Sequence, residues 1–585
     1  MSFSLLFSLQ AIAQPTSTTT APNISLEELV TYTRQSNFIK EFQIPILEER
    51  GLKGITTDSQ GYAWFYHSTN KTSTVIKLEL ENNNNNKTFM SYNVEANTAV
   101  DNPIINLAGG QLVFDNGRNL VWFTDARTNS IGKLDITSGK MELINIPTPQ
   151  SGPMGIVLSP DNNSIWFAEI TGDKIARLDI ESNKILEYPT DNDSGPTLLT
   201  FDSKGILWVT LSYTHSILRV ETWALVPNVR SMGMSTITLS KPDTFSPLGI
   251  AVISDGGDGK KTGLQKMFVS DHGSSRVISS NDLKLNTLQS YTSYWTSPSQ
   301  VYPTTLPSQI VADKSGKNIY FPQHGGNRIS KISSESGIMT EYDIPTGPLS
   351  TALFIAVSDD GKKVWFTEYA SNKVAYLDTT LPVPVNLQIN NTDDIPIILK
   401  RNEPKSLDVL LNLDDKNYSF SSPNSVSLSE VELAIVGMSD SGHRGITYDA
   451  QPQRVNLENN SAVTAKINLN AEEEDDDNNR ARPGNYTIMI KASAPEKNSS
   501  SLSFVSLLYP VAITLDIPPA AAANDTSQQQ TSIEDKSSQQ KSAFPNDTIV
   551  RDLARIISLS LAIALIGYIV YRRIKRSKRS PEQQQ

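Results

Sequence analysis

A short apolar strand with an aromatic core recurs through the first two thirds of the chain. Its seven copies carry these core pairs: Trp64-Phe65, Trp122-Phe123, Trp166-Phe167, Trp208-Val209, Phe268-Val269, Tyr320-Phe321 and Trp365-Phe366. The copies follow one another at about 42 to 60 residues. Repeats of short strands at such a period are typical of a β-propeller. The pattern predicts an all-β fold with a seven-bladed β-propeller over residues 38–380.

The seventh repeat lacks its outer strand. It stops after the segment 374–377 and continues into Thr379-Thr380-Leu381-Pro382. A matching outer strand, 41–45, stands alone before the first repeat. We predict that this N-terminal strand completes the last blade, because an uncovered sheet edge is prone to aggregation.

After Pro382 the repeat gives way to shorter alternating segments. Seven of them are candidate strands: 385–389, 395–399, 407–413, 426–436, 462–469, 486–492 and 503–517. This number of short strands predicts an immunoglobulin-like (Ig-like) β-sandwich over residues 382–518. The Pro-Gly-Asn-Tyr-Thr-Ile-Met-Ile run within 482–492 resembles a strand of prokaryotic Ig-like surface modules, which commonly act as spacers.

The two ends of the chain predict export and anchoring. Residues 1–13 combine an apolar run with a small-residue cleavage pattern, which is typical of a signal peptide, although a buried terminal segment is the alternative. Residues 519–549 are rich in Ala, Ser and Gln and predict a disordered stalk. Residues 553–571 predict a transmembrane helix rather than an amphipathic surface helix, and 572–585 form a basic tail. The positive-inside rule then predicts a single-pass cell-membrane protein with an extracellular ectodomain and a cytoplasmic C-terminus.

Composition narrows the possible chemistry. The formal net charge of the 585 residues is −11 at pH 7, which argues against nucleic acid as a partner. Cysteine is absent, so disulfides, Cys-based metal centres and Cys nucleophiles are excluded, and only five histidines are present. Twelve Asn-x-Ser/Thr sequons are compatible with a glycoprotein, each being weak evidence alone.

The repeat reads P-x-G-I, then W-F-[TA]-[ED], then N-x-I-x-[RK]-L-D, then E-Y-x-[IL]-P. In this form it resembles the virginiamycin B lyase (streptogramin lyase) family of seven-bladed propellers, and NHL-type propellers more generally. The resemblance covers residues 38–380. It implies a carbon-oxygen lyase in which histidines of P-H-G-I and P-H-A-I openings hold magnesium, with a Glu at the end of a W-F-x-x-E strand, and supply the catalytic base.

This chain departs from the family at the histidine position. The seven occupants are Lys53, Ile104, Met154, Thr197, Leu248, Ser308 and Ser350, and none is histidine. The lyase reaction therefore has no visible general base at its usual place.

A second set of positions could bind a cation. Three residues after the first aromatic of each pair, at the end of its strand, stand His67, Asp125, Glu169, Leu211, Asp271, Gln323 and Glu368. If these strand ends face the central channel, the oxygen-rich ring of His67, Asp125, Glu169, Asp271, Gln323 and Glu368 suits Mg²⁺ or Ca²⁺. The alternative is structural: acidic strand ends can cap turns or bind backbone amides between blades.

Two loop histidines are the remaining acid–base candidates. His272 and His324 follow the core strands of two successive repeats and occupy equivalent positions. Solvated loop histidines without a role are the alternative.

Two functions remain open from the sequence. The first is a cell-surface propeller that binds an extracellular ligand, protein or glycan without lyase activity. The second is a metal-dependent lyase or lactone hydrolase that acts at the mouth of the channel, with the carboxylate ring and a histidine as its catalytic groups.

Overall fold

The computed structural model describes most of the chain between residues 30 and 516. The described ranges are 30–45, 50–69, 72–81, 86–95, 109–230, 232–239, 245–254, 265–281, 283, 287–288, 290–299, 301–302, 304–390, 396–413, 427–437, 446–458, 462–471, 483–495 and 504–516. Within these ranges the helical elements are two 3-10 turns, Thr222–Ala224 and His272–Ser274, and all others are strands. The predicted all-β fold is confirmed for these residues.

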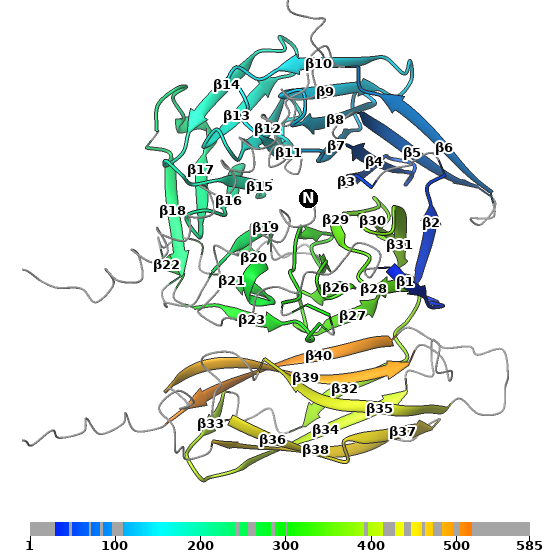
Figure 1. Ribbon diagram of the computed structural model, residues 1–585. Coiled ribbons are helices and arrows are strands. Elements are labelled where there is room, and N and C mark those ends of the chain that lie inside the picture. Colours follow the sequence, from blue (N-terminus) through cyan, green and yellow to red (C-terminus); the bar gives the residue numbers. More distant parts are fainter. Residues whose placement is uncertain are drawn as a thin grey trace, which may run out of the picture. The chain divides into compact units, whose positions relative to one another are not determined.

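Seven antiparallel sheets stand around a common centre as the blades of a β-propeller (Figure 1). Each blade begins with its innermost strand. Blade 1 comprises β3 (Leu52–Thr57), β4 (Ala63–Ser68), β5 (Ser73–Glu81) and β6 (Asn86–Asn93). Blade 2 comprises β7 (Leu112–Asp115), β8 (Leu120–Asp125), β9 (Ser130–Asp135) and β10 (Met141–Asn145). Blade 3 comprises β11 (Pro153–Leu158), β12 (Ser164–Glu169), β13 (Lys174–Asp179) and β14 (Ile185–Pro189).

The next three blades follow the same order. Blade 4 comprises β15 (Pro196–Phe201), β16 (Ile206–Leu211), β17 (Ser216–Glu221) and β18 (Met234–Leu239), with β22 (Thr287–Leu288) added in parallel at its edge. Blade 5 comprises β19 (Pro247–Ser254), β20 (Gln265–Asp271), β21 (Arg276–Ser280) and β23 (Thr292–Trp295). Blade 6 comprises β24 (Val311–Ala312), β25 (Asn318–Gln323), β26 (Arg328–Ser333) and β27 (Met339–Asp343).

The last blade is closed by the N-terminal part of the chain. Blade 7 comprises β29 (Ala352–Val357), β30 (Lys363–Glu368), β31 (Lys373–Asp378) and β2 (Ile39–Gln43). Strand β2 pairs antiparallel with β31, so that Phe42 lies opposite Val374. This confirms the predicted closure. A short strand before it, β1 (Val30–Thr33), pairs with β28 (Thr346–Pro348).

Neighbouring blades are linked by hydrogen bonds from side-chain hydroxyl groups of the second strands. Each hydroxyl donates a hydrogen bond to a backbone carbonyl at the start of the next blade's first strand. The bonds are Thr124 to Met154 (2.8 Å), Thr210 to Leu248 (2.7 Å), Ser270 to Ser308 (2.7 Å) and Thr367 to Lys53 (2.6 Å). The last of these joins blade 7 to blade 1. The Thr of the W-F-T-E repeat therefore has a structural role between blades.

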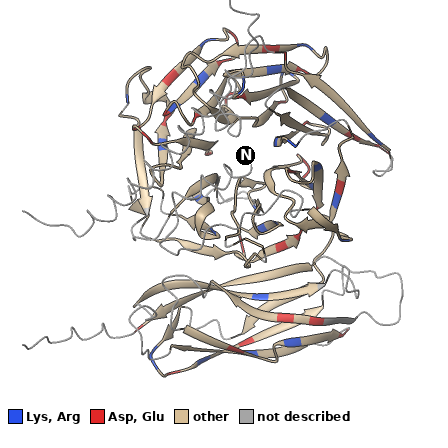
Figure 2. Cartoon of the chain, in the orientation of Figure 1, with Lys and Arg blue, Asp and Glu red and all other residues tan. Residues whose placement is uncertain are grey.

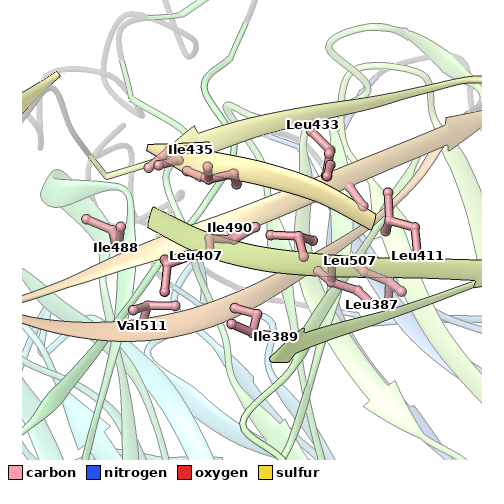
Figure 3. Close-up of a cluster of buried hydrophobic side chains, with 14 of the residues drawn as sticks. Leu387, Ile389, Leu407, Leu411, Leu433, Ile435, Ile488, Ile490, Leu507 and Val511 are labelled. Carbon is pink, nitrogen blue, oxygen red and sulfur yellow. The ribbon is translucent and has the colours of Figure 1, made fainter. Parts of the chain in front are cut away.

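A two-sheet β-sandwich follows the propeller. One sheet consists of β32 (Val385–Asn390), β34 (Lys405–Leu413), β38 (Ala462–Ala471) and β36 (Ile446–Gln451). The other contains β40 (Phe504–Leu515), β39 (Gly484–Pro495), β35 (Ser427–Val436) and β37 (Arg454–Glu458), with β33 (Ile397–Leu399) beside β40. Side chains such as Leu411, Leu433 and Ile490 fill the space between the sheets (Figure 3). The Ig-like assignment stays a prediction.

The second sheet of the sandwich continues blade 6. Strand β40 pairs antiparallel with β27, the outer strand of that blade, and places Leu508 opposite Met339. The two strands lie side by side in Figure 1. Met489 and Leu508 of the sandwich pack in one buried cluster with Trp295 and Met339 of the propeller. The sandwich is thus joined to the propeller by a hydrogen-bonded ladder and a shared core.

Basic and acidic residues are interspersed over the blades and the sandwich (Figure 2). Several pair across neighbouring strands of one blade, as Lys174 does with Glu187 at 2.6 Å and Lys373 with Glu41 at 2.7 Å.

Several predicted segments lie outside the described residues. These are the signal peptide (1–13), the stalk (519–549), the membrane span (553–571) and the basic tail (572–585). In the part of the chain that the structure describes, no helix has the length and apolar character needed to cross a bilayer.

Candidate functional site

The predicted ring residues occupy the ends of the second strands, as expected. Asp125, Glu169, Leu211, Asp271, Gln323 and Glu368 are each the last residue of their strand, and His67 is the penultimate residue of β4. All seven are buried. The structure assigns most of them partners on neighbouring strands and loops.

Glu169 lies beside a carboxylate of the outer strand of its blade. Neither carboxyl oxygen of Glu169 has a hydrogen-bond partner among the described residues. Its neighbour Glu187 accepts hydrogen bonds from the backbone N–H and the hydroxyl of Thr148, both 2.8 Å, and an ion pair from Lys174. Burial, together with the charge of Glu187, raises the pKa of Glu169 to about 8. Glu169 is therefore protonated and Glu187 ionised at neutral pH.

Blade 7 repeats this arrangement. Glu41 accepts hydrogen bonds from the N–H (2.9 Å) and the hydroxyl (2.7 Å) of Thr346 and an ion pair from Lys373. Glu368 stands next to it, and burial together with the Glu41 carboxylate raises the pKa of Glu368 well above its usual value. The hydroxyl of Ser371 donates to one oxygen of Glu368 at 2.7 Å.

Blade 6 carries an amide in place of the acid. The Nε2 group of Gln323 donates to Glu341 at 2.8 Å and to Ser330 at 2.6 Å. Burial alone would raise the pKa of Glu341, but the charges of Arg328 and Lys491 outweigh it and hold this pKa below its usual value. Lys491 belongs to β39, so the sandwich contributes a charge to this blade.

The other two carboxylates of the ring are also bound within the propeller. Asp271 forms a buried ion pair with Arg276 at 2.8 Å and accepts the backbone N–H of Ser246 at 2.8 Å. Asp125 accepts the backbone N–H of Arg127 at 2.9 Å through Oδ1, and its Oδ2 has no hydrogen-bond partner among the described residues.

Among the described residues, no group of three or more His, Cys, Asp or Glu side chains is arranged to hold a metal ion. The contacts above fit the structural alternative, in which the strand ends bind their own blade. Binding of Mg²⁺ or Ca²⁺ by these residues stays a prediction.

The outer-strand glutamates are the site residues that the sequence reasoning missed. Glu187 and Glu341 come from the E-Y segment of the repeat and Glu41 from the matching segment Glu41-Phe42, which provided a visible signal. Their role could not be inferred because each acts on a residue of the second strand, across the third strand between them.

The histidine position of the family opens the first strand of a blade. Lys53, Met154, Thr197 and Leu248 are on β3, β11, β15 and β19, and Ser308 and Ser350 precede β24 and β29, while Ile104 lies outside the described residues. Lys53 is buried, and this burial, opposed by the charge of Asp125, lowers its pKa to about 8. The described positions therefore supply one amine and no imidazole.

The two loop histidines lie together. Their rings stack with centroids 4.9 Å apart and an angle of 18° between planes, and the two Nε2 atoms are 3.3 Å apart. The sequence placed both at equivalent positions of successive repeats, and the structure brings blades 5 and 6 into contact there.

Comparisons with known proteins agree with a propeller. The virginiamycin B lyase family model matches residues 37–257, which include β2, blades 1 to 4 and the first strand of blade 5. A comparison with curated proteins finds no match.

The solved structures to which this chain shows some similarity include lyases and an extracellular domain. A streptogramin B lyase is 24% identical, with a TM-score of 0.45, covering 58% of this chain and 97% of its own. A catalytically inactive virginiamycin B lyase variant from Staphylococcus aureus, solved with quinupristin, is 22% identical, with a TM-score of 0.45, covering 58% and 98%. The extracellular domain of a one-component system from B. thetaiotaomicron is 13% identical, with a TM-score of 0.40, covering 83% and 59%. Over residues 37–257 the chain is thus similar to the virginiamycin B lyase family, and this stretch lies within a β-propeller.

Proposed function

We propose that the protein is a cell-surface β-propeller that binds an extracellular ligand, protein or glycan and lacks the lyase activity of the family it resembles. The segments 1–13 and 553–571 support export and membrane anchoring. The sandwich, proposed as Ig-like, would then hold the propeller outside the cell, above the stalk at 519–549.

One observation carries this proposal: the first-strand openings hold no imidazole at any described position. General-base catalysis needs a group whose pKa lies near the working pH and that reaches the proton it removes. Among the described openings Lys53, with a pKa of about 8, has such a pKa, but its side chain is buried. Met154 and Leu248 are half-buried apolar side chains there, and Thr197 is buried and bonded to Thr210 at 2.7 Å. The apolar openings at Met154 and Leu248 are suited to binding rather than to proton transfer.

The test is an activity assay on the full-length protein. Quinupristin is incubated with the protein and Mg²⁺, and the ring-opened product is sought by chromatography. We expect no product above the protein-free control. Product that depends on both protein and Mg²⁺ would refute the non-catalytic proposal.

That second outcome is the alternative function, a metal-dependent lyase or lactone hydrolase. The family match over residues 37–257 and the retained carboxylates Asp125, Glu169, Asp271 and Glu368 favour it. In that case Glu169→Ala and Asp271→Ala should abolish turnover, whereas a pure binding protein has no turnover to lose.

A further inference from the structure

A loop of blade 4 carries the four most exposed large apolar side chains of the described residues. These are Trp223, Val226, Val229 and Met232, which are 67%, 55%, 53% and 104% exposed. The loop, residues 222–233, joins β17 to β18 on the outer side of the blade (Figure 1). The same connection has five residues in blades 2, 3 and 6 and twelve here. The repeat does not require this extension, so its exposed apolar residues need a reason of their own.

Hydrogen bonds hold the loop in place. The backbone N–H of Asn228 donates to the carbonyl of Glu187 on β14 at 2.9 Å. Arg230 donates twice to the carboxylate of Asp191, at 3.0 and 3.3 Å. Leu225 packs against the core cluster between blades 3 and 4. The loop is therefore attached to the propeller on one side and presents its other apolar side chains to solvent.

The charges of the loop are paired. Arg230 is the one charged residue between positions 222 and 233, and it forms an ion pair with Asp191. At the base of the loop, Arg219 pairs with Glu221 at 2.9 Å. An exposed apolar surface whose charges are paired is complementary to an uncharged, apolar partner rather than to an anionic or cationic one.

The apolar surface is too small for a stable protein–protein interface. Such an interface takes about 800 Å² and about 20–30 residues from each partner. Here four apolar side chains of one loop are available. A lipid bilayer needs no complementary surface, because affinity for it scales with the apolar area that is buried. Tryptophan is also enriched where membrane and water meet.

The anchoring in the proposed function keeps the loop near a bilayer. Residues 517–552 separate the described fold from the predicted membrane span at 553–571. As a flexible coil, this segment extends over about 30–36 Å. A tether of this length makes membrane contact an intramolecular event, so a small apolar surface is sufficient for it.

We propose that residues 222–233 dock on the lipid bilayer that anchors the chain, with Trp223, Val226, Val229 and Met232 inserted among the lipids. This inference rests on the membrane anchoring of the proposed function and adds a second contact with the membrane. The contact orients the propeller relative to the bilayer, because a flexible tether alone leaves it free to rotate.

The test measures contact between Trp223 and lipid in the full-length protein, reconstituted into phosphatidylcholine vesicles. The other six of the seven tryptophans are at most 6% exposed, and residues 553–571 contain none. Trp223 is therefore the tryptophan that reports contact at the surface. We expect vesicles with brominated acyl chains to quench part of the tryptophan emission, and Trp223→Ser to abolish this quenching.

Two matched substitutions separate insertion of the loop from a general effect of added charge. Val226→Asp keeps the reporter but places a charge among the inserted side chains, so quenching should fall about twofold or more. Ile398→Asp changes a residue of the sandwich that is 51% exposed, against 55% for Val226, and should leave the quenching as in the wild type. Absence of quenching in the wild type, or an equal loss in the two variants, overturns the proposal.

Flotation of the vesicles distinguishes this inference from the anchoring on which it rests. Wild type and Trp223→Ser that both float without any quenching keep the anchor and refute docking of the loop. Wild type that floats and is quenched, beside Trp223→Ser that does not float, supports the loop and refutes the anchor. If acrylamide and brominated lipid both fail to quench Trp223, a second copy of the chain covers the loop, which also overturns the proposal.

Discussion

Glu169 and Gln323 occupy the same position in blades 3 and 6 but differ in how their polar atoms are satisfied. The Gln323 amide donates to the outer-strand Glu341 and to Ser330. Glu169 meets the equivalent outer-strand carboxylate, Glu187, and must stay protonated to do so. Blade 6 thus shows that glutamine is a better partner than glutamate for the outer-strand carboxylate.

Replacing Glu169 by Gln should stabilise the protein at alkaline pH. The folded pKa of Glu169, about 8, is above its unfolded value of 4.5. Between these two pKa values the folded state therefore holds one proton more than the unfolded state. The stabilisation that comes from this proton is fully present below pH 4.5 and is lost as the pH rises through about 8. The loss is up to about 1.4 kcal/mol per pH unit in this window. Denaturation at pH 5 and pH 9 should show a smaller pH dependence for Glu169→Gln.

The control for this substitution is Glu181→Gln, which replaces a carboxyl group by an amide in the same way at an exposed turn of the same blade. It should leave the pH dependence of unfolding as it is in the wild type. If Glu169→Gln also leaves it unchanged, Glu169 is ionised in the folded protein and the assignment of its protonation state is wrong.

Only part of the candidate site was predictable at the residue scale. The W-F-[TA]-[ED] repeat identifies the strand-end positions, and equivalence between repeats identifies His272 and His324. The repeat pattern cannot show that the two imidazole rings touch, since His272 and His324 are 52 residues apart along the chain. It also cannot show that Lys53 is buried or that Glu187 faces Glu169, because these depend on how strands and blades pack.

At the scale of the elements, β2 determines whether the ring of blades is closed. Its Phe42 is 8% exposed and stacks on Tyr376 of β31 with ring centroids 5.9 Å apart. Its Glu41 binds Lys373 and Thr346. Lys40, on the same strand, is exposed. Apolar and ionic contacts thus act together to hold a strand that is more than 300 residues from its partner.

Phe42→Asp should therefore open the ring at blade 7. Loss of a buried phenylalanine costs about 3–5 kcal/mol, and an unpaired carboxylate in its place adds to this. Chemical denaturation should show this loss, with faster proteolysis after residue 30 because β2 leaves its sheet. Lys40→Asp on the same strand should change stability by less than about 0.5 kcal/mol. Equal effects of the two substitutions would contradict the closure described here.

The closure of blade 7 was predictable and the pairing of β27 with β40 was not. A repeat count leaves one outer strand missing and one spare, so the sequence identifies both partners of β31. Strand β27 carries the same E-Y pattern as β14, which is the last strand of its own sheet. Strand β27 differs in having the apolar surface of β40, including Leu508, as its neighbour. That surface forms only when the sandwich folds, so the repeat pattern does not reveal it.

At the scale of the molecule, this pairing makes the sandwich more than a spacer. Trp295 of blade 5 packs so closely on Gly437 that a Cβ atom there would be 2.5 Å from the indole ring. Glu341 of blade 6 depends in part on the charge of Lys491 of the sandwich for its ionised state. The two parts therefore share a sheet, a core cluster and a buried ionic group, and should unfold as one unit.

Removing the sandwich should destabilise the propeller itself. A chain ending at residue 381 leaves the edge of β27 unpaired and withdraws Val436, Met489 and Leu508 from the cluster around Met339. At about 1.5–3 kcal/mol for each buried apolar side chain, the propeller loses about 5 kcal/mol or more and exposes an edge that can pair with another copy. A chain ending at residue 519 keeps all of these contacts and should remain monomeric. Scanning calorimetry and light scattering compare the two: an unchanged, monomeric propeller after truncation at 381 would mean that the sandwich folds and acts independently, as a spacer does.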